Sequence, residues 1–189
     1  ESEKIEKFDT PGIRTIEALS SIGHPPEHQI KTLVYMVDGN LSLLLLRGDH
    51  QFQEQKFCDA TSSMEILPAD EDAIKKALGA SPGSLGAVGV DGITIFADPA
   101  LKGRSAMTTG ANEDDFHLSG VNVERDIRVD QWVDMRAIAD GEGCPSCSEP
   151  LRVARCIEAG HIFKLGQKYA EAMGVSVLDS EGNSQTPTM

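Results

Sequence analysis

The sequence is poor in aromatic residues and in basic charge, and it contains no long hydrophobic run. Aromatic side chains make up 5% of its 189 residues, and 17 Lys and Arg stand against 30 Asp and Glu, which gives a formal net charge of −13. Broad nucleic-acid binding needs clustered Lys and Arg to neutralise phosphates, so this charge argues against it. The longest apolar run is too short to cross a bilayer and no signal peptide opens the chain, so we expect no membrane contact.

Cysteine is also scarce, and the four cysteines form no regular framework: Cys58, Cys144, Cys147 and Cys156. This usage is typical of a reducing, cytoplasmic setting. The run Cys144-Pro145-Ser146-Cys147 is half of a zinc-ribbon pattern, but no second pair follows at the expected spacing. Cys156 with His161 or His50 could complete a site only with unusual geometry. We therefore expect no bound metal and an exposed CxxC turn over residues 140–150.

The stretch from Gln29 to Lys56 organises the predicted fold. Its first half, Ile30 to Val37, is almost continuously apolar and rich in β-branched residues, which favours a strand buried on both faces. Asp38-Gly39 suits a tight hairpin turn with positive φ, and Leu41 to Leu46 supplies the returning strand. With 40% hydrophobic residues, the chain can bury one good core around this hairpin.

Three further segments have a clear pattern. Asp70 to Gly79 is predicted as a helix, because acidic residues begin it, lysines lie near its end and Gly79 is a natural C-cap. Asp126 to Met135 is predicted as a strand with charged punctuation. Glu1 to Thr10 is charged and is predicted as a tether. The first residue is Glu1 rather than Met, which predicts a fragment of a longer protein.

Some residues have two interpretations. Lys31, where the buried strand begins, is either a lysine whose ammonium reaches water or one held at the lip of a pocket for an anionic or carbonyl group. The loop Ser81 to Val88 is either a turn or a segment whose amides approach a ligand closely. If Phe116 to Leu118 is a strand, alternation places His117 on the face opposite its apolar neighbours, as a satisfied histidine or part of a site. Asp98, before a proline, is typical of a turn.

Four segments resemble, in the same order, the editing domain of bacterial prolyl-tRNA synthetases. They are the Lys31-Thr32-Leu33 strand with its hairpin and Arg47-Gly48-Asp49-His50 corner, GSLGAV (Gly83 to Val88), GANEDDFHLSGVN (Gly110 to Asn122) and GHIFKLGQKYAEAM (Gly160 to Met173). A proline usually stands in that family where this chain has Ala87. The resemblance implies a YbaK-like α/β fold with a central mixed, largely antiparallel sheet, curled toward a barrel and flanked by short helices.

The resemblance also implies an activity, the hydrolysis of alanine wrongly esterified to proline tRNA. Lys31 would be the catalytic residue that positions and polarises the ester or the terminal phosphate, and water would be the nucleophile. Amides of the loop that contains Gly83, Ser84 and Gly86 would bind the substrate and stabilise the developing oxyanion.

Further site residues are implied in the same way. His117 would form a pocket wall that helps to select the amino-acid side chain, and Asp98 would be a pocket carboxylate. Glu158 and His161 match positions near the proline pocket of the synthetase catalytic domain, and Cys156 stands where that family usually has glycine.

We expect four regions: a linker and the end of a preceding catalytic region (1–21), the editing insertion (22–139), the exposed CxxC turn (140–150) and part of a class II synthetase catalytic domain (151–189). The last region stops before the arginine-bearing signature that grips ATP, so aminoacylation by this chain alone is not expected. The implied partners are the 3′ end of an aminoacyl-tRNA and the remainder of the synthetase. Editing would need no cofactor, whereas the intact parent would use ATP and Mg²⁺ and form a homodimer. The alternatives are a non-catalytic module on the same fold that binds a tRNA end or a protein, and a free-standing deacylase.

Overall fold

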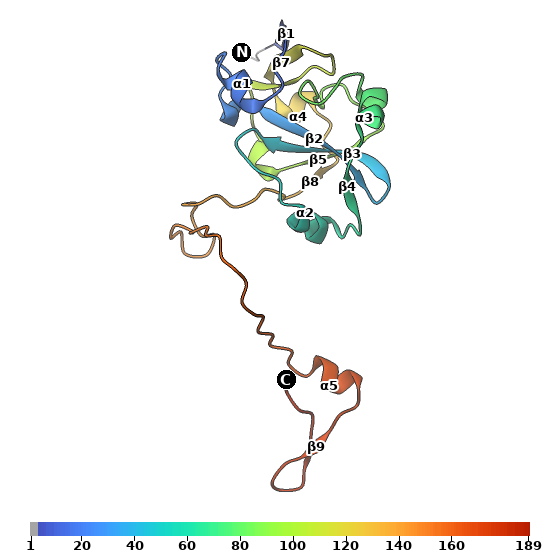
Figure 1. Cartoon of the computed structure of the whole chain (residues 1–189), viewed down its shortest axis with the longest axis vertical. Helices are drawn as coiled ribbons and strands as arrows, with labels where there is room; N and C mark the ends of the chain where they lie inside the picture. The colour runs from blue at the N-terminus through green and yellow to red at the C-terminus, as the bar shows by residue number, and fades with distance from the viewer. Residues whose placement is uncertain (1–3) are drawn as a thin grey trace. The chain divides into compact units, whose positions relative to one another are not determined.

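The structure is a computed structural model that describes residues 4–189 (Figure 1). It divides into two compact units, Glu1–Ile138 and Ala139–Met189. The first unit, called unit 1, contains two β-sheets, and the second, unit 2, contains one two-stranded sheet. None of the helices in residues 4–189 has the length and apolar character that crossing a bilayer requires.

Unit 1 has a five-stranded sheet in the order β4-β2-β3-β5-β8 and a three-stranded sheet in the order β1-β7-β6. In the larger sheet β2 pairs antiparallel with β3 and β4, whereas β5 pairs parallel with β3 and β8; the smaller sheet is antiparallel throughout. The predicted α/β fold with a mixed sheet and short helices is therefore confirmed. The elements are β1 (Glu6–Asp9), α1 (Ile16–Ser20), η1 (Pro26–His28), β2 (Ile30–Val37), β3 (Asn40–Arg47), α2 (Glu54–Thr61), β4 (Ile66–Pro68), α3 (Glu71–Leu78), β5 (Thr94–Ala97), η2 (Pro99–Leu101), β6 (Met107–Gly110), β7 (Phe116–Val121), α4 (Val123–Asp126) and β8 (Gln131–Trp132).

The β2–β3 hairpin has the turn that the sequence predicts. Val37 pairs with Asn40, which leaves Asp38 and Gly39 as a two-residue loop with φ of 47° and 78°. Positive φ at both positions is the geometry that matches the twist of a two-stranded hairpin. The Asp38 carboxylate also accepts hydrogen bonds from two backbone amides just before β4, which ties the turn to the neighbouring strand.

The core lies on both faces of the larger sheet, as the apolar run predicts. Leu43 and Leu45 on β3 face a cluster that includes Met107 of β6, whereas Leu44 and Leu46 face a cluster around Phe57 of α2. All four leucines have zero exposed surface. Burying one such side chain stabilises a fold by about 1.5–3 kcal/mol, so β3 is the strand on which unit 1 depends most.

The helix predicted over residues 70–79 is confirmed as α3. The Asp70 side chain accepts from the Ala73 amide and caps the N-terminus, and Gly79 ends the helix with a φ of 88°. Thr15 caps α1 in the same manner through the Ala18 amide.

Two predictions for unit 1 are wrong. Glu1 to Thr10 is predicted as a tether, but β1 pairs with β7 and Thr10 is fully buried, so the described part of this segment belongs to the fold. Residues 1–3 lie outside the described residues. Asp126 to Met135 is not one strand. Asn122 caps α4 through the Arg125 amide, Asp126 in turn accepts from the Asn122 amide, and only Gln131–Trp132 pairs as a strand. This reciprocal capping offers the backbone a local alternative to strand pairing.

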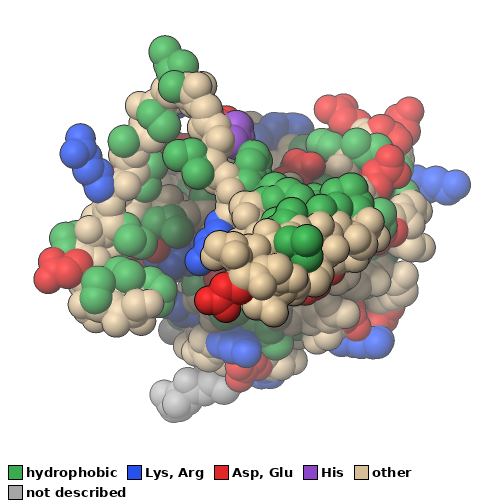
Figure 2. Space-filling view, turned by 90° about the horizontal axis from the view of Figure 1, so that it is seen from below, with side chains coloured by type: hydrophobic (Ala, Val, Ile, Leu, Met, Phe, Trp, Pro, Cys, Tyr) green, Lys and Arg blue, Asp and Glu red, His purple; other side chains and the backbone are tan. Residues whose placement is uncertain are grey.

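Unit 2 is mostly extended. It contains a CPSC hairpin, helix α5 (Lys168–Ala172) and a two-stranded hairpin of β9 (Val177–Leu178) and β10 (Ser184–Gln185). The segment from Arg152 to Phe163 pairs with no strand in the described residues. Large apolar side chains of this unit, such as Ile157 and Ile162, are almost fully exposed. Uncovered hydrophobic side chains are visible on the face of the molecule shown in Figure 2.

Candidate active site beside the edge of β2

A cavity of about 390 Å³ opens between the two sheets of unit 1. β4 pairs with β2 only over Tyr35–Val37, so it leaves the edge of β2 at Lys31–Leu33 without β4. On this side of β2, the preceding residue Gln29 forms an isolated bridge with Thr108 of β6. The cavity lies along this edge, and its walls come from α1, β2, the loop after α3, β6 and β7: Arg14, Thr15, Ile16, Glu17, Leu19, Gln29, Ile30, Lys31, Thr32, Leu33, Pro82, Gly83, Leu85, Thr108, Thr109, Gly110 and His117.

The loop over residues 81–87 forms one wall because two glycines let it lie directly on β6. A Cβ at Gly86 would lie 2.0 Å from the Gly110 carbonyl oxygen, and a Cβ at Gly110 would lie 2.2 Å from the Ser84 carbonyl carbon. The Asn112 side chain binds both the amide and the carbonyl group of Gly86 in this loop. Its Oδ1 accepts from the Gly86 amide and its Nδ2 donates to the Gly86 carbonyl oxygen, both at 2.9 Å.

His117 lies in the wall of the cavity on β7 and is 5% exposed. Its Nδ1 is 2.6 Å from the Thr10 hydroxyl oxygen. Burial lowers the pKa of His117, and a hydrogen bond with the Gly83 backbone opposes that shift. The Thr10 hydroxyl and the Gly83 backbone therefore both hold the ring, which suits a positioned wall.

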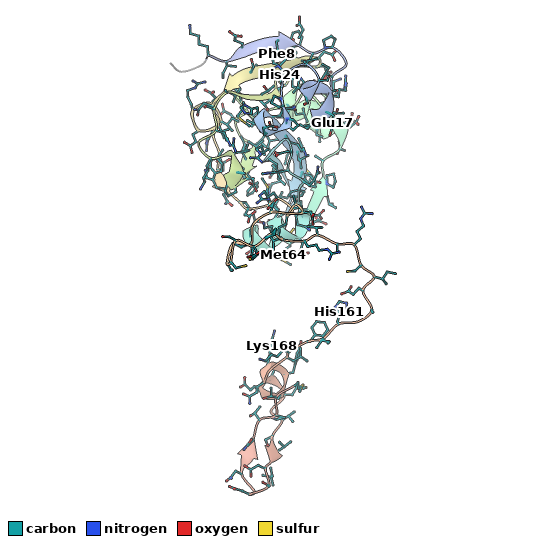
Figure 3. The ribbon with its side chains drawn as sticks, turned by 90° about the vertical axis from the view of Figure 1, so that its left-hand side faces the viewer. Phe8, Glu17, His24, Met64, His161 and Lys168 are labelled. Carbon is teal, nitrogen blue, oxygen red and sulfur yellow. The ribbon has the colours of Figure 1, made fainter. Side chains whose placement is uncertain are left out.

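Aromatic and hydroxyl side chains support His117 from behind. Phe8 on β1 stacks on His24 with ring centroids 4.7 Å apart (Figure 3), and Phe8 lies 6.2 Å from the His117 ring. His24 Nδ1 is 2.8 Å from the hydroxyl of Thr108, which lines the cavity. Burial lowers the pKa of His24, so this layer is neutral at pH 7.

Lys31 lines the cavity, but its ammonium group is directed to the opposite side of the sheet. Alternation along β2 places Ile30 in the core between the two sheets, whereas Lys31 is on the other face. Its Nζ donates to the His50 carbonyl oxygen at 2.7 Å. Burial lowers the pKa of Lys31, and the carboxylates of Glu17 and Asp49 oppose that shift. The catalytic role of Lys31 stays a prediction.

The corner that holds His50 is built by local contacts. Arg47 binds Asp49 through two hydrogen bonds of 2.6 and 2.8 Å, and the Gly48 amide donates to the Gln29 carbonyl oxygen. A Cβ at Gly48 would lie 2.5 Å from the Pro26 carbonyl oxygen, so the corner requires glycine. This contact fixes the carbonyl group to which Lys31 donates.

The three predicted substrate-binding residues of the loop differ in their contacts. Gly83 lines the cavity, but the Ser84 amide donates to the Ser81 carbonyl and the Gly86 amide to Asn112. These two amides are therefore engaged within the loop, and the substrate-binding roles of Gly83, Ser84 and Gly86 stay predictions. Within the described residues, the Leu85 amide has no hydrogen bond to another backbone group, and Leu85 lines the cavity.

Asp98 does not belong to the cavity. It is 1% exposed, and its Oδ1 accepts from the Ala100 amide while its Oδ2 accepts from the Met135 amide. Its carboxylate therefore caps η2 and holds the segment after β8. This geometry is that of the turn-forming aspartate that the sequence also suggested, and it gives the predicted pocket role no support.

Three side-chain oxygens of lining residues are buried with no partner in the described residues: Gln29 Oε1, Thr32 Oγ1 and Thr109 Oγ1. Both hydrogens of the Gln29 amide group are used, by the Ile16 and His24 carbonyls, so the orientation of its oxygen is fixed. Unsatisfied buried polar atoms are uncommon in folded proteins and collect where a ligand or water supplies the partner. Their presence here supports a binding role for this cavity.

The predicted residues of unit 2 lie on exposed chain. His161 Nε2 is 2.9 Å from Glu158 Oε1, and both side chains are more than half exposed. Hydrogen bonds from the backbone of Ser146 and Cys147 lower the pKa of Cys144, and all four cysteines are free thiols. No group of three or more His, Cys, Asp and Glu able to hold a metal ion occurs among residues 4–189.

Unit 1 is thus a mixed α/β unit with a cavity of about 390 Å³ between its two sheets, lined by polar and apolar side chains, which is where ligand sites commonly lie. Residues 10–127 match the family described as the aminoacyl-tRNA editing domain, and the chain belongs to that family. Every residue that lines the cavity lies within this span.

Known relatives agree with this assignment. The chain is 46% identical over 186 residues to a proline--tRNA ligase of Anaeromyxobacter sp. (strain Fw109-5) and 41% identical over 182 residues to one of Pelotomaculum thermopropionicum. Each match covers 96% of this chain and 32% of the relative, so the chain spans about one third of their length. A solved structure, that of a proposed trans-editing enzyme for prolyl tRNA synthetase, has the same fold, with a TM-score of 0.55 at 16% identity over 64% of this chain and 78% of that chain. The predicted resemblance to the prolyl-tRNA synthetase editing domain is confirmed.

Proposed function

We propose that the chain hydrolyses alanine wrongly esterified to proline tRNA, as the editing domain of a proline--tRNA ligase. The observation that carries the proposal is that every residue lining the cavity lies inside the residues that match the family. The relatives named as proline--tRNA ligases support the parts of the proposal that concern the parent synthetase and its tRNA.

The size of the cavity supports an ester substrate. At no more than about 30 Å³ for each non-hydrogen atom, an alanyl ester of six such atoms needs at most about 180 Å³. The cavity of about 390 Å³ therefore has room for the alanyl group and part of the terminal ribose. The wall at His117 then decides how large an amino-acid side chain can enter.

A second pocket of this kind answers a physical need of the parent enzyme. A synthetic site that admits proline cannot strongly exclude the smaller alanine, because the lost methylene groups give discrimination of only about 1–3 kcal/mol. A separate pocket that accepts alanine and excludes proline removes the error by hydrolysis.

In the proposed reaction, water attacks the ester carbonyl and the chain supplies charge and orientation. The Gly83 and Leu85 amides belong to lining residues and donate to no other group of the described chain, so they would bind the developing oxyanion. Lys31 would add positive charge at the edge of the cavity after exchanging its bond with the His50 carbonyl for one with substrate. Glu158 and His161 would act only in the catalytic domain of the parent, near its proline pocket.

The remaining parts of the proposal concern the parent enzyme. It would be a cytoplasmic homodimer that uses ATP and Mg²⁺ for aminoacylation, whereas editing would need no cofactor. Residues 151–189 would complete its catalytic domain only together with chain outside this sequence, so this chain alone would edit but not aminoacylate.

The test is release of alanine from alanyl-tRNA(Pro) by the purified chain. The unsubstituted chain should hydrolyse the ester. Lys31→Ala should slow hydrolysis by about a hundredfold, the usual effect of losing one electrostatic contact to a developing charge. Lys76→Ala is the matched control, because Lys76 is an exposed lysine of α3 outside the cavity. If the unsubstituted chain binds the tRNA end without hydrolysing the ester, the chain is a non-catalytic module instead.

A further inference from the structure

Three charged side chains line the cavity, and two of them are already engaged. Lys31 donates to the His50 carbonyl oxygen, and the Glu17 carboxylate lies close enough to Lys31 to raise its pKa against the effect of burial. The third is Arg14, which is exposed between the turn at Gly12 and the start of α1. His117 adds no charge at pH 7, because burial lowers its pKa.

The aliphatic part of the Arg14 side chain is packed, whereas its guanidinium group has no side-chain partner among the described residues. A Cβ at Gly83, where φ is 108°, would lie 2.6 Å from the Arg14 Cβ and 2.9 Å from its Cγ, so the loop backbone packs directly on the arginine stem. Within residues 4–189 the guanidinium group makes no hydrogen bond or ion pair with a side chain. Asp114 feels the charge of Arg14, but its carboxylate is bonded to the amide and hydroxyl of Ser81.

A fixed stem with an unpaired guanidinium group at the mouth of a cavity fits a phosphate. The guanidinium group presents planar donors that match phosphate oxygens, and it stays charged at any physiological pH. The need for such a group is strong here, because a net charge of −13 makes the chain as a whole repel a polyanion. Of the two cationic side chains that line this cavity, Arg14 is the one free to bind a phosphate.

We propose that Arg14 binds the phosphate on the 5′ side of the terminal nucleoside whose aminoacyl ester enters the cavity. The inference rests on the proposed function, and it assigns phosphate recognition to Arg14 rather than to Lys31. Arg14 is a positioning residue: it holds the end of the RNA so that the ester lies along the edge of β2. Binding of this kind is felt equally in the ground state and the transition state, so it lowers KM and leaves kcat almost unchanged.

Two small esters isolate the contact, 3′-O-alanyl-adenosine and the same ester with a 5′-phosphate. Parent chain should hydrolyse the phosphorylated ester with a kcat/KM about tenfold to a hundredfold higher, the usual strength of a hydrogen bond to a charged group. Arg14→Gln should remove this preference by raising KM for the phosphorylated ester alone, and Arg14→Lys should restore part of it. Arg128→Gln is the control, since Arg128 is an exposed arginine outside the cavity.

A binding measurement keeps the inference independent of turnover. Adenosine 5′-monophosphate should bind parent chain more tightly than adenosine in a titration followed by NMR, and Arg14→Gln should bind both equally. Hydrolysis of neither ester by parent chain would overturn the proposed function, whereas the titration would still decide the role of Arg14. Equal binding of adenosine and adenosine 5′-monophosphate by the unsubstituted chain would overturn the inference. A preference for the phosphate that survives in Arg14→Gln at an unchanged melting temperature would do so as well.

Discussion

Gly110→Ala is the substitution that most directly tests the construction of the cavity. A Cβ at this position would lie 2.2 Å from the carbonyl carbon of Ser84, 2.3 Å from its oxygen and 2.4 Å from the Leu85 nitrogen. Ordinary contact needs about 3.5 Å, so the loop must move away from β6 by roughly 1 Å or more. All three atoms belong to the backbone and cannot rotate aside as the end of a side chain can. The substitution therefore displaces the cavity wall that carries Gly83 and Leu85.

The energetic cost follows from the same contacts. Overpacking typically costs about 1–3 kcal/mol, and weakening the two Asn112–Gly86 hydrogen bonds adds about 1 kcal/mol for each bond that is lost. Replacing glycine also stiffens the unfolded chain, which returns about 0.4–1 kcal/mol. The net loss is about 2–4 kcal/mol, and at roughly 3–5 °C for each kcal/mol in a unit of this size the melting temperature should fall by on the order of 10 °C.

The assay combines a thermal melt followed by circular dichroism with the alanyl-tRNA(Pro) hydrolysis assay at a temperature where the variant is folded. Gly160→Ala is the matched control, because nothing lies within 4 Å of a Cβ there and the backbone is not left-handed. We expect the control to retain the parental melting temperature and rate. A Gly110→Ala chain that melts within about 2 °C of the control and hydrolyses at the parental rate would refute the reasoning, because the loop would then not need to lie against β6.

Three further predictions concern specificity, pH and metal. His117→Ala should enlarge the cavity, so hydrolysis of prolyl-tRNA should rise relative to alanyl-tRNA, and an unchanged ratio in a stable variant would exclude a selective wall. Burial lowers the pKa of His117 below 6.5. The stability contributed by the neutral ring is therefore complete above pH 6.5 and is lost as the pH falls through the pKa of the folded state. Between about pH 7 and pH 5, the melting temperature of His117→Asn should fall less steeply than that of the unsubstituted chain. Because no described cluster supplies three ligands, the purified chain should contain less than one zinc per chain and keep its melting temperature in chelator, and one tightly bound zinc by elemental analysis would contradict this.

Local signals in the sequence predicted the elements that local contacts determine. Asp38-Gly39 specified the β2–β3 turn because both residues tolerate positive φ, and Asp70 and Gly79 specified the ends of α3 because one caps its amides and the other adopts the left-handed conformation. Burial on both faces, predicted from the apolar run of Ile30 to Val37, is complete in the returning strand at Leu43 to Leu46. In β2 itself only Ile30, Val34 and Val37 are buried.

The walls of the cavity could not be predicted in this way, because they depend on contacts between distant residues. Gly86 and Gly110 are 24 positions apart, and only the fold shows that each leaves room for the backbone of the other. Thr10 was assigned to a tether because its segment is charged, yet it is buried and bonded to His117. Arg14 was missed for a different reason: an isolated arginine before a short helix carries no pattern, and only its place at the cavity distinguishes it.

The acidity of the chain is compatible with the proposed function once the affinity that this unit needs is considered. If the remaining two thirds of the parent enzyme hold the body of the tRNA, the 3′ end reaches the cavity as a tethered group at an effective concentration of the order of millimolar. Occupying the cavity then requires a dissociation constant of only about 1 mM, or about 4 kcal/mol of binding free energy. One phosphate contact at Arg14 and burial of the ester along β2 are enough for this, so a strongly basic surface is unnecessary. The same arithmetic predicts that the isolated chain binds free aminoacyl-tRNA weakly, even where it hydrolyses the ester efficiently once bound.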